Sequence, residues 1–589
     1  MTRDWKVVGD DALKAGDNIA AEQAYTNAIA TAEANADLNR YQLYAARSAA
    51  HHNAKNFSKS LEDAERAIFL KPSFGIGHLR VGHALEGLQR LEKAYESYKT
   101  GLVHDPTNKY LIQARDAIVK QRDRAMKHQQ PFLEGGELTA NYQIFLEWLQ
   151  EGNAYFPKIT LREYTNEHRG VHALSDIIAD ELLTSIPRSL IITTEIAIQS
   201  AIGKSIIRSG VEIRSRHSLL AAFLLQERAR PLSDPSFWAP YLNVLPEKFE
   251  NIPLNFSREE LAYLKGSMVI DKIDSRVETL KSEYQRLIEN VPEFKQFTYD
   301  DFAWARSIVI TRIFGICVDG RKTEALVPFA DFLNHRRPRE TVWVYEPLTS
   351  AFTITAIGCI NAGAQISDSY GRKCNSRFFT NYGFSLAEND DNEALIRIPV
   401  NQEDPALDRK AILLGDEEFE FERSFSVPAN VNCGAAFDEM MSYLRLSSAS
   451  NSELDTFYGL SVPNLKRVLP MNHRNETASL QLLKMACKRS LSLFDTTIEE
   501  DDELLTSPSL TSNIRNCILM RLGEKRVLSY FITFVDDMIP LLSFSQSDIE
   551  WVLRSCIKRN FCGAFDVYVK SVVEPLIRVR QNNRSVALP

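Results

Sequence analysis

The chain has 589 residues, of which 44% are hydrophobic and 25% charged, and its formal net charge is −8. This is the profile of a soluble, multidomain protein, and its mild acidity disfavours binding to nucleic-acid phosphates as the main task. No segment reaches the roughly 18 apolar residues that a membrane span needs, and the acidic opening residues do not fit a secretory signal. We therefore expect a cytoplasmic protein, with the nucleus as a second compartment. We expect it to bind neither membrane nor nucleic acid.

The first part of the chain, residues 5–106, contains an internal repeat. Pro72 and Pro106 lie 34 residues apart. Matching positions hold small residues where paired helices must touch, namely Gly9, Ser48 and Gly82. Large residues fill the gaps between helices at Tyr25 and Tyr98, and the matching position of the middle repeat holds Ala64. The pattern resembles a tetratricopeptide (TPR) array of three repeats, and we assign residues 1–125 to it. Such arrays present a groove to a protein partner, although a purely scaffolding role is the alternative.

Two other interpretations of this region are disfavoured. Many TPR arrays bind the C-terminal carboxylate of a chaperone, but the corresponding positions here hold Lys6, Asp10, Ala46, Ile76 and Arg80. Asp10 would repel a carboxylate. The GIGHLRVG run at residues 75–82 looks like a dinucleotide-binding loop, but no strand precedes it, and we expect it inside a repeat helix.

The rest of the chain mixes strand and helix signals. Residues 126–150 read as a linker and connecting helix, and strand-like runs occupy residues 189–197 and 341–357. Residues 215–300 have amphipathic helical spacing, and from about residue 396 the pattern is helical to the end. The acidic run at residues 499–503 is expected to be a solvated loop.

The cysteines argue against a disulfide framework and against a structural metal. All eight lie at or after Cys317, and no C-x-x-C pair occurs. We expect reduced thiols and no metal site.

Four short segments could carry chemistry: NEHRGVHA at 166–173, TRIF at 311–314, LVPFADFLNHRRP at 326–338 and GAQISDSYGRKCNSRFFTNYGF at 363–384. Each has an ordinary explanation on its own. Gly170 permits a tight turn, a lone Arg312 is usually part of a structural ion pair, and a tyrosine before glycine, such as Tyr370 or Tyr382, is commonly a packed aromatic at a turn.

The order and spacing of the four segments change that interpretation, because together they resemble the SET-domain methyltransferases. Within these, the chain is most similar to the Rubisco lysine methyltransferase class, which also has an actin-histidine branch. The resemblance implies a multidomain α+β architecture: a β-rich, pseudoknotted SET domain at 151–395 with a helical insert at about 215–300, and an all-α substrate-binding domain at 396–589. The branch that carries a zinc-binding MYND module fits less well, because this chain lacks the cysteines that module needs.

The resemblance also implies a cofactor, S-adenosylmethionine, and a role for individual residues. Glu167, His168 and Arg169 would lie along the cofactor, Arg312 would approach its methionine carboxylate, and Asn334 and His335 would hold it. Tyr370 would be the catalytic residue at the methyl-transfer pore and would also contact the cofactor. Tyr382 and Phe384 would wall the substrate channel, with Asp331 beside its entrance.

Two neighbours of these motifs bear on the nucleophile. Phe314 and the small Ala330 would leave an apolar slot that suits a long aliphatic amine, whereas an imidazole would call for a polar partner. We therefore expect a monomeric protein-lysine N-methyltransferase that acts on a non-histone protein and docks a partner through its TPR array. The alternatives are a protein-histidine methyltransferase and an adaptor whose SET core is degenerate and inactive.

Overall fold

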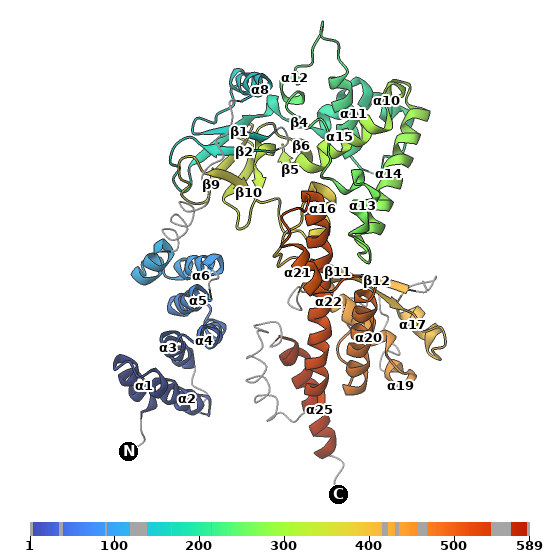
Figure 1. The fold of residues 1–589 in the computed structure, drawn as a ribbon. Helices are drawn as coiled ribbons and strands as arrows, with labels where there is room; N and C mark the ends of the chain where they lie inside the picture. The colour runs from blue at the N-terminus through green and yellow to red at the C-terminus, as the bar shows by residue number, and fades with distance from the viewer. Residues whose placement is uncertain are drawn as a thin grey trace. The chain divides into compact units, whose positions relative to one another are not determined.

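The computed structural model describes residues 4–34, 39–88, 91–117, 138–165, 168–213, 215–414, 422–429, 435–455, 468–543 and 567–585. The chain divides into two compact units, Met1–Gly135 and Gly136–Pro589 (Figure 1). Nowhere in the described part of the chain does a helix combine the length and the apolar character that crossing a membrane requires.

The first unit is a row of helices in which each helix packs against the next. Its helices are α1 (Trp5–Lys14), α2 (Asn18–Ala34), α3 (Arg40–Asn53), α4 (Phe57–Leu70), α5 (Gly75–Gly87) and α6 (Leu91–His104). A Cβ atom at Gly9 would lie 2.6 Å from the ring of Tyr25, and one at Gly82 would lie 2.0 Å from the ring of Tyr98. The repeated glycine therefore makes room for the repeated tyrosine, which is the packing expected from the repeat.

Two details of this unit agree with the sequence-based interpretation. The GIGHLRVG run lies in α5 and forms no phosphate-binding loop. Lys6 donates a hydrogen bond from Nζ to Asp10 Oδ2 at 2.8 Å. This pairing neutralises one of the two basic side chains that a chaperone carboxylate would need.

The second unit begins with a helix and three small sheets. The strands are β1 (Ile159–Thr165), β2 (His168–Ala173), β3 (Leu182–Pro187), β4 (Ile192–Thr193), β5 (Ile313–Val318), β6 (Arg321–Leu326), β7 (Asn334–His335), β8 (Thr341–Glu346), β9 (Ala351–Ala356) and β10 (Gln365–Asp368). They pair in the orders β1-β2-β10-β7, β3-β9-β8 and β4-β6-β5. The β8–β9 hairpin confirms the strands predicted at 341–357. Helix α8 (Ala140–Glu151) contributes Phe145 and Leu149 to the same hydrophobic core, so the core reaches further towards the N-terminus than residue 151.

A helical insert separates β4 from β5. Its helices are α9 (Thr194–Gln199), α10 (Ala201–Ser209), α11 (His217–Arg228), α12 (Ala239–Leu242), α13 (Arg258–Ala262), α14 (Val269–Asn290) and α15 (Tyr299–Arg312). The insert is longer than predicted at both ends, and the strand predicted over 189–197 is wrong for most of its length. Only Ile192 and Thr193 form a strand, because the Thr193 side chain accepts a hydrogen bond from the Ile196 N–H and caps α9.

The C-terminal region is mainly helical, as expected, but it opens with a hairpin that the sequence did not predict. Strand β11 (Glu393–Pro399) pairs antiparallel with β12 (Glu422–Pro428). Besides α16 (Asn375–Tyr382), which precedes the hairpin, the helices are α17 (Leu407–Leu414), α18 (Ala435–Ser447), α19 (Asn451–Leu454), α20 (His473–Leu491), α21 (Ile498–Leu504), α22 (Ser512–Ser543) and α25 (Glu574–Ser585). β11 packs on α20 and α22 and supplies Ile396 and Ile398 to their core.

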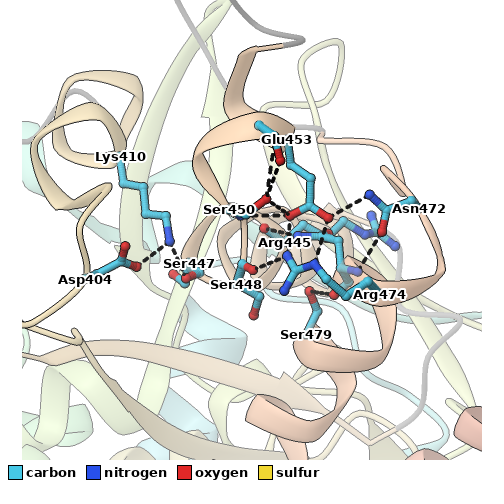
Figure 2. A network of polar contacts seen from close by, with 12 residues as sticks. Asp404, Lys410, Arg445, Ser447, Ser448, Ser450, Glu453, Asn472, Arg474 and Ser479 are labelled. Atoms are coloured by element: carbon cyan, nitrogen blue, oxygen red, sulfur yellow. Dashed lines mark hydrogen bonds and ion pairs between the residues drawn. The ribbon is translucent and has the colours of Figure 1, made fainter.

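Polar networks fix the helices of this region (Figure 2). Buried Arg445 donates from Nε and Nη2 to the two carboxylate oxygens of Glu476, each at 2.8 Å. Its Nη1 donates to the carbonyl oxygen of Val468 at 2.7 Å. Figure 2 also shows Lys410 pointing to Asp404 and to Ser447, whose carbonyl accepts at 2.8 Å. These contacts join α17, α18 and α20.

The acidic run at 499–503 is helical, and the expectation of a solvated loop is wrong. Thr497 forms a capping box with Glu500 and starts α21. Asp501 is fully buried and accepts hydrogen bonds from Arg521 Nη2 at 2.6 Å and Lys525 Nζ at 2.7 Å. Arg521 also donates to the carbonyl oxygen of Tyr263 at 2.9 Å, so this ion network ties α22 to the insert.

A buried acid on α22 predicts a dependence of stability on pH. Burial raises the pKa of Glu524 from 4.5 to about 7, and its Oε2 has no hydrogen-bond partner among the described residues. Because the folded state holds the proton more tightly, the stability that this group contributes is present below pH 4.5 and is lost as the pH rises through 7. Glu524→Gln should therefore stabilise the protein by up to about 3 kcal/mol at pH 8 and by little at pH 5. Urea unfolding at both pH values measures this, and equal shifts at the two pH values would contradict it.

Candidate active site

Three of the four sequence segments meet at one short strand, β10. In register, β10 pairs antiparallel with β2 through Ile366 and Val171, and parallel with β7 through Ser367 and Asn334. The Asn334 side chain crosses to the first motif and donates from Nδ2 to the carbonyl oxygen of Arg169 at 2.9 Å. Motifs that lie almost 200 residues apart in the sequence are therefore brought side by side.

An aromatic cluster surrounds Tyr370. Its ring centroid lies 4.7 Å from that of Tyr382 and 5.2 Å from that of His335. His335 in turn stacks on Phe384 at 5.8 Å, and Phe378 on α16 packs against both, at 4.7 and 5.1 Å. Tyr382 and Phe384 thus lie beside Tyr370, where the resemblance puts the walls of the channel.

Both polar groups of Tyr370 are held in place. Its hydroxyl donates to the carbonyl oxygen of Leu333 at 3.0 Å, and its backbone N–H donates to Nδ1 of His335 at 3.0 Å. Burial raises the pKa of Tyr370 above its usual range, so the hydroxyl stays protonated at neutral pH.

His335 is neutral and has one hydrogen-bonding atom to spare. Burial, and next the charges of Arg337 and Lys373, lower its pKa to about 4. Because Nδ1 accepts from Tyr370, the ring proton sits on Nε2. That atom is buried and finds no partner in the described part of the chain, so it is a donor for a bound ligand.

Beside this cluster lies a buried group of charged residues that packs against the ring of Phe332. Arg312 Nη1 donates to Asp331 Oδ2 at 3.1 Å and to the Asp331 carbonyl oxygen at 3.0 Å. Tyr241, from the insert, donates its hydroxyl to the same Oδ2 at 2.7 Å. The guanidinium carbons of Arg169 and Arg312 lie 4.5 and 5.4 Å from the ring centroid of Phe332, a geometry that favours cation–π attraction.

This set of charges carries more positive than negative charge. Burial, and next the charge of Arg312, lower the pKa of Arg169 to about 10, so both guanidiniums are protonated at neutral pH. Burial opposes the charge of Arg312, but pairing with Asp331 outweighs it and raises the pKa of Arg312. Three buried atoms have no partner among the described residues: Arg169 Nη2, Arg312 Nε and Asp331 Oδ1. Two donors and one acceptor fit the carboxylate and ammonium of an amino-acid group.

The position of Asp331 differs from the expectation. Its side chain is completely buried against Arg312 and Tyr241 rather than placed beside the substrate entrance. Burial raises the pKa of the Asp331 carboxyl, although the charge of Arg312 opposes this. The residue lies in the interior of the site because Tyr241, 90 residues earlier, covers it.

The remaining predicted residues lie as follows. Phe314 is on β5, and its ring packs against Trp343 at 5.4 Å and Phe352 at 5.1 Å, while Ala330 is buried. His168 begins β2, and Glu167 lies outside the described residues. Phe332 and Tyr241 belong to the site but were not predicted from the sequence, and the same holds for Tyr142, whose ring centroid lies 6.1 Å from that of Phe332. The only signal for Phe332 was its place between Asp331 and Asn334.

Comparisons with known proteins agree with this architecture. Residues 401–528 match the family model described as Rubisco LSMT substrate-binding. The chain is 27% identical to the actin-histidine N-methyltransferase of Gallus gallus over 74% of this chain and 77% of that protein. It is also 27% identical to the protein of that name in Mus musculus, over 70% and 73%.

Solved structures give the same result. The structure of Rubisco LSMT bound to AdoMet matches with a TM-score of 0.57 at 25% identity, covering 72% of this chain and 98% of that one. A SET core that holds the predicted motifs is followed here by the matched substrate-binding domain. In its SET core and its C-terminal region, the chain is similar to the SET-domain methyltransferases of the Rubisco LSMT-like class.

Proposed function

We propose that the chain is an S-adenosylmethionine-dependent protein-lysine N-methyltransferase that acts on a non-histone protein. The observation that carries the proposal is the apolar, aromatic cluster around Tyr370, which adjoins a buried cluster suited to an amino-acid zwitterion. Relatives of the class act on different nucleophiles: those quoted above are named for actin histidine, and a Rubisco LSMT SET domain has been solved with lysine and AdoHcy.

The residues of the site fit the cofactor. Arg169 Nη2 and Arg312 Nε would hold the methionine carboxylate, and Asp331 Oδ1 would accept from its ammonium group. Asn334 and the Nε2–H of His335 provide further donors. When bound, the cofactor supplies an electrophilic methyl group on a sulfonium sulfur, so the protein has to align the groups rather than activate the methyl.

The chain's own residues would favour the neutral form of the lysine amine, which is the nucleophile. A free lysine has a pKa of about 10.4 and must lose its proton before it can attack. Aromatic walls from Tyr370, Tyr382 and Phe384 disfavour the ammonium form by desolvation. The Tyr370 hydroxyl donates its hydrogen bond to the Leu333 carbonyl oxygen. The hydroxyl oxygen therefore remains free to accept weak hydrogen bonds from polarised C–H groups, such as those of the methyl group.

Lysine is favoured over histidine by the two residues singled out from the sequence. Phe314 offers a half-buried ring without a hydrogen-bonding group, and Ala330 a buried methyl. Neither can hold an imidazole by a hydrogen bond, whereas both suit an aliphatic chain.

Incubating cell lysates with methyl-labelled cofactor tests the function. We expect a labelled protein whose hydrolysate contains N-methyllysine, and no label with Tyr370→Phe. Methylhistidine in the hydrolysate would favour the histidine alternative instead. If no protein is labelled and calorimetry detects no cofactor binding, the chain is the inactive adaptor.

A separate prediction concerns Arg169. Replacing it with leucine should raise the Kd for S-adenosylmethionine about tenfold or more, because a buried charged hydrogen bond is lost. Binding of 5′-methylthioadenosine, which lacks the amino-acid half, should not change. Arg321→Leu, at the exposed first residue of β6, is the matched control. Equal losses for both ligands in calorimetry would contradict a contact to the carboxylate.

The N-terminal array completes the proposal. Its helix pairs would dock a protein partner, and the enzyme would work as a monomer in the cytoplasm, with the nucleus as a second location. The mild acidity of the chain, with a net charge of −8, suits basic protein targets better than nucleic acid.

A further inference from the structure

The helical insert carries a large cleft that the chemistry described so far does not use. The cleft has a volume of about 810 Å³ and is bounded by the segment 247–257, by α14, by the first turns of α15 and by Asn513 at the start of α22. Its walls therefore come from both the insert and the C-terminal region. Side chains from the aromatic cluster around Tyr370 do not line it.

The floor of the cleft is apolar and firmly held. Phe249, Leu254 and Leu280 line it together with Trp304. The Trp304 indole donates from Nε1 to the carbonyl oxygen of Pro246 at 2.8 Å, which fixes the ring in the wall. A preformed apolar floor of this kind suits an aliphatic or aromatic side chain of a partner.

The rim of the cleft is acidic. Glu247, Glu250 and Asp300 are exposed there, and Glu260 is half-buried. Only two ammonium groups, of Lys248 and Lys281, line the same cleft. The surplus of carboxylates favours a cationic occupant.

The cleft adjoins the turn that carries the channel residues Tyr382 and Phe384. Asn251, which follows the cleft residue Glu250 in the chain, donates from Nδ2 to the Tyr382 carbonyl oxygen at 3.4 Å. Gly383 has a φ of +77°, and a Cβ there would lie 2.2 Å from the Asn251 carbonyl oxygen, so the turn packs against the backbone of the segment that bounds the cleft.

Helix α22 supports the cleft and the turn together. Asn513 donates from Nδ2 to Glu260 Oε1 at 2.7 Å and to the Glu250 carbonyl oxygen at 3.0 Å. Asn516 donates to the Gly383 carbonyl oxygen at 3.3 Å and accepts from the Ser385 N–H at 2.8 Å. Three residues rise about 4.5 Å along a helix, so these two supports lie within one helical turn.

We propose that this cleft binds the stretch of the protein substrate next to the target residue, and that it selects a basic residue beside an apolar one. The inference rests on the proposed function, since it takes the Tyr382 turn as the wall of the substrate channel. It adds the chemical class of substrate: a basic, partly apolar segment rather than an acidic one.

Binding of synthetic peptides tests the inference without requiring turnover. Fluorescein-labelled 13-residue peptides with a central lysine would carry Arg-Leu, Glu-Leu or Ser-Gly pairs on both sides, and anisotropy with the full chain would give each Kd. We expect the Arg-Leu peptide to bind about tenfold more tightly than the Glu-Leu peptide. In the double variant Glu247→Lys/Glu250→Lys, the preference for the Arg-Leu peptide over the Glu-Leu peptide should be lost or reversed. The control Glu147→Lys/Glu439→Lys changes two exposed acids that do not line the cleft, and it should keep the order.

The outcomes separate the two proposals. Equal Kd values for the three peptides, or the same order in both double variants, would overturn the cleft assignment. A dimer seen by sedimentation that the Glu247→Lys/Glu250→Lys variant loses would overturn it too, because a second copy would then occupy the cleft. Methyl transfer is measured on the same peptides and on a set with central histidine. Transfer to histidine with the same flank preference would overturn the lysine assignment and support the cleft.

Discussion

Replacing Tyr370 with phenylalanine is expected to lower the rate of methyl transfer about a hundredfold, the usual effect of losing one polar group that acts in the transition state. The hydroxyl is held by Leu333 and lies in the aromatic cluster, so the substitution removes one oxygen and leaves the packing in place. Single-turnover measurements with labelled cofactor give the rate, and calorimetry should show a cofactor Kd within about twofold of the original.

Tyr382→Phe is the matched control for this experiment. The ring of Tyr382 packs at a tilt against that of Tyr370, and burial raises the pKa of Tyr382 as it does that of Tyr370. Because no polar contact to the reacting groups is assigned to its hydroxyl, we expect a much smaller loss of rate. Full activity of Tyr370→Phe, or equal losses in the two variants, would remove Tyr370 from the catalytic role.

The second large effect is expected at Asp501, far from the chemistry. Asp501→Asn should lower the free energy of unfolding by about 3–5 kcal/mol, because Arg521 and Lys525 would remain buried without their counter-ion. Urea unfolding followed by circular dichroism measures the change.

The next residue in the chain provides the control. Asp502 is exposed and pairs with Arg526 at the surface, so Asp502→Asn should change stability by less than about 1 kcal/mol. Similar effects of the two substitutions would mean that the buried network contributes little to stability.

The resemblance of the motifs to a known class implied that Asn334, His335 and Tyr370 share one site. Asn334, His335 and Tyr370 come together because β7 and β10 are neighbours in one sheet and their ends carry these residues. The pairing of glycine with tyrosine in the first and third TPR repeats was also predictable, since the tyrosine ring fits only where the facing residue has no side chain. In both cases the information is local, or it repeats at a fixed spacing.

What the sequence could not predict depends on contacts from distant elements. Asp331 looks like a surface residue at a turn until Tyr241 of the insert covers it. The run around Asp501 has the composition of a solvated loop, and only Arg521 and Lys525, on the following helix, make its burial possible. The hairpin of β11 and β12 was missed because its two strands are 23 residues apart and pack on helices that follow much later.

Helix α22 has a consequence for how this protein can be divided. Its first turn supports the loop of Tyr382 and Phe384 through Asn516, while residues further along, such as Phe531 and Phe534, are core of the C-terminal region. A fragment that ends before Ser512 would contain every residue assigned here to the methyl transfer, but it would lack the clamp on the substrate channel. We therefore expect a fragment that is competent in methyl transfer to extend at least into α22, because the C-terminal region helps to hold the turn of Tyr382 and Phe384.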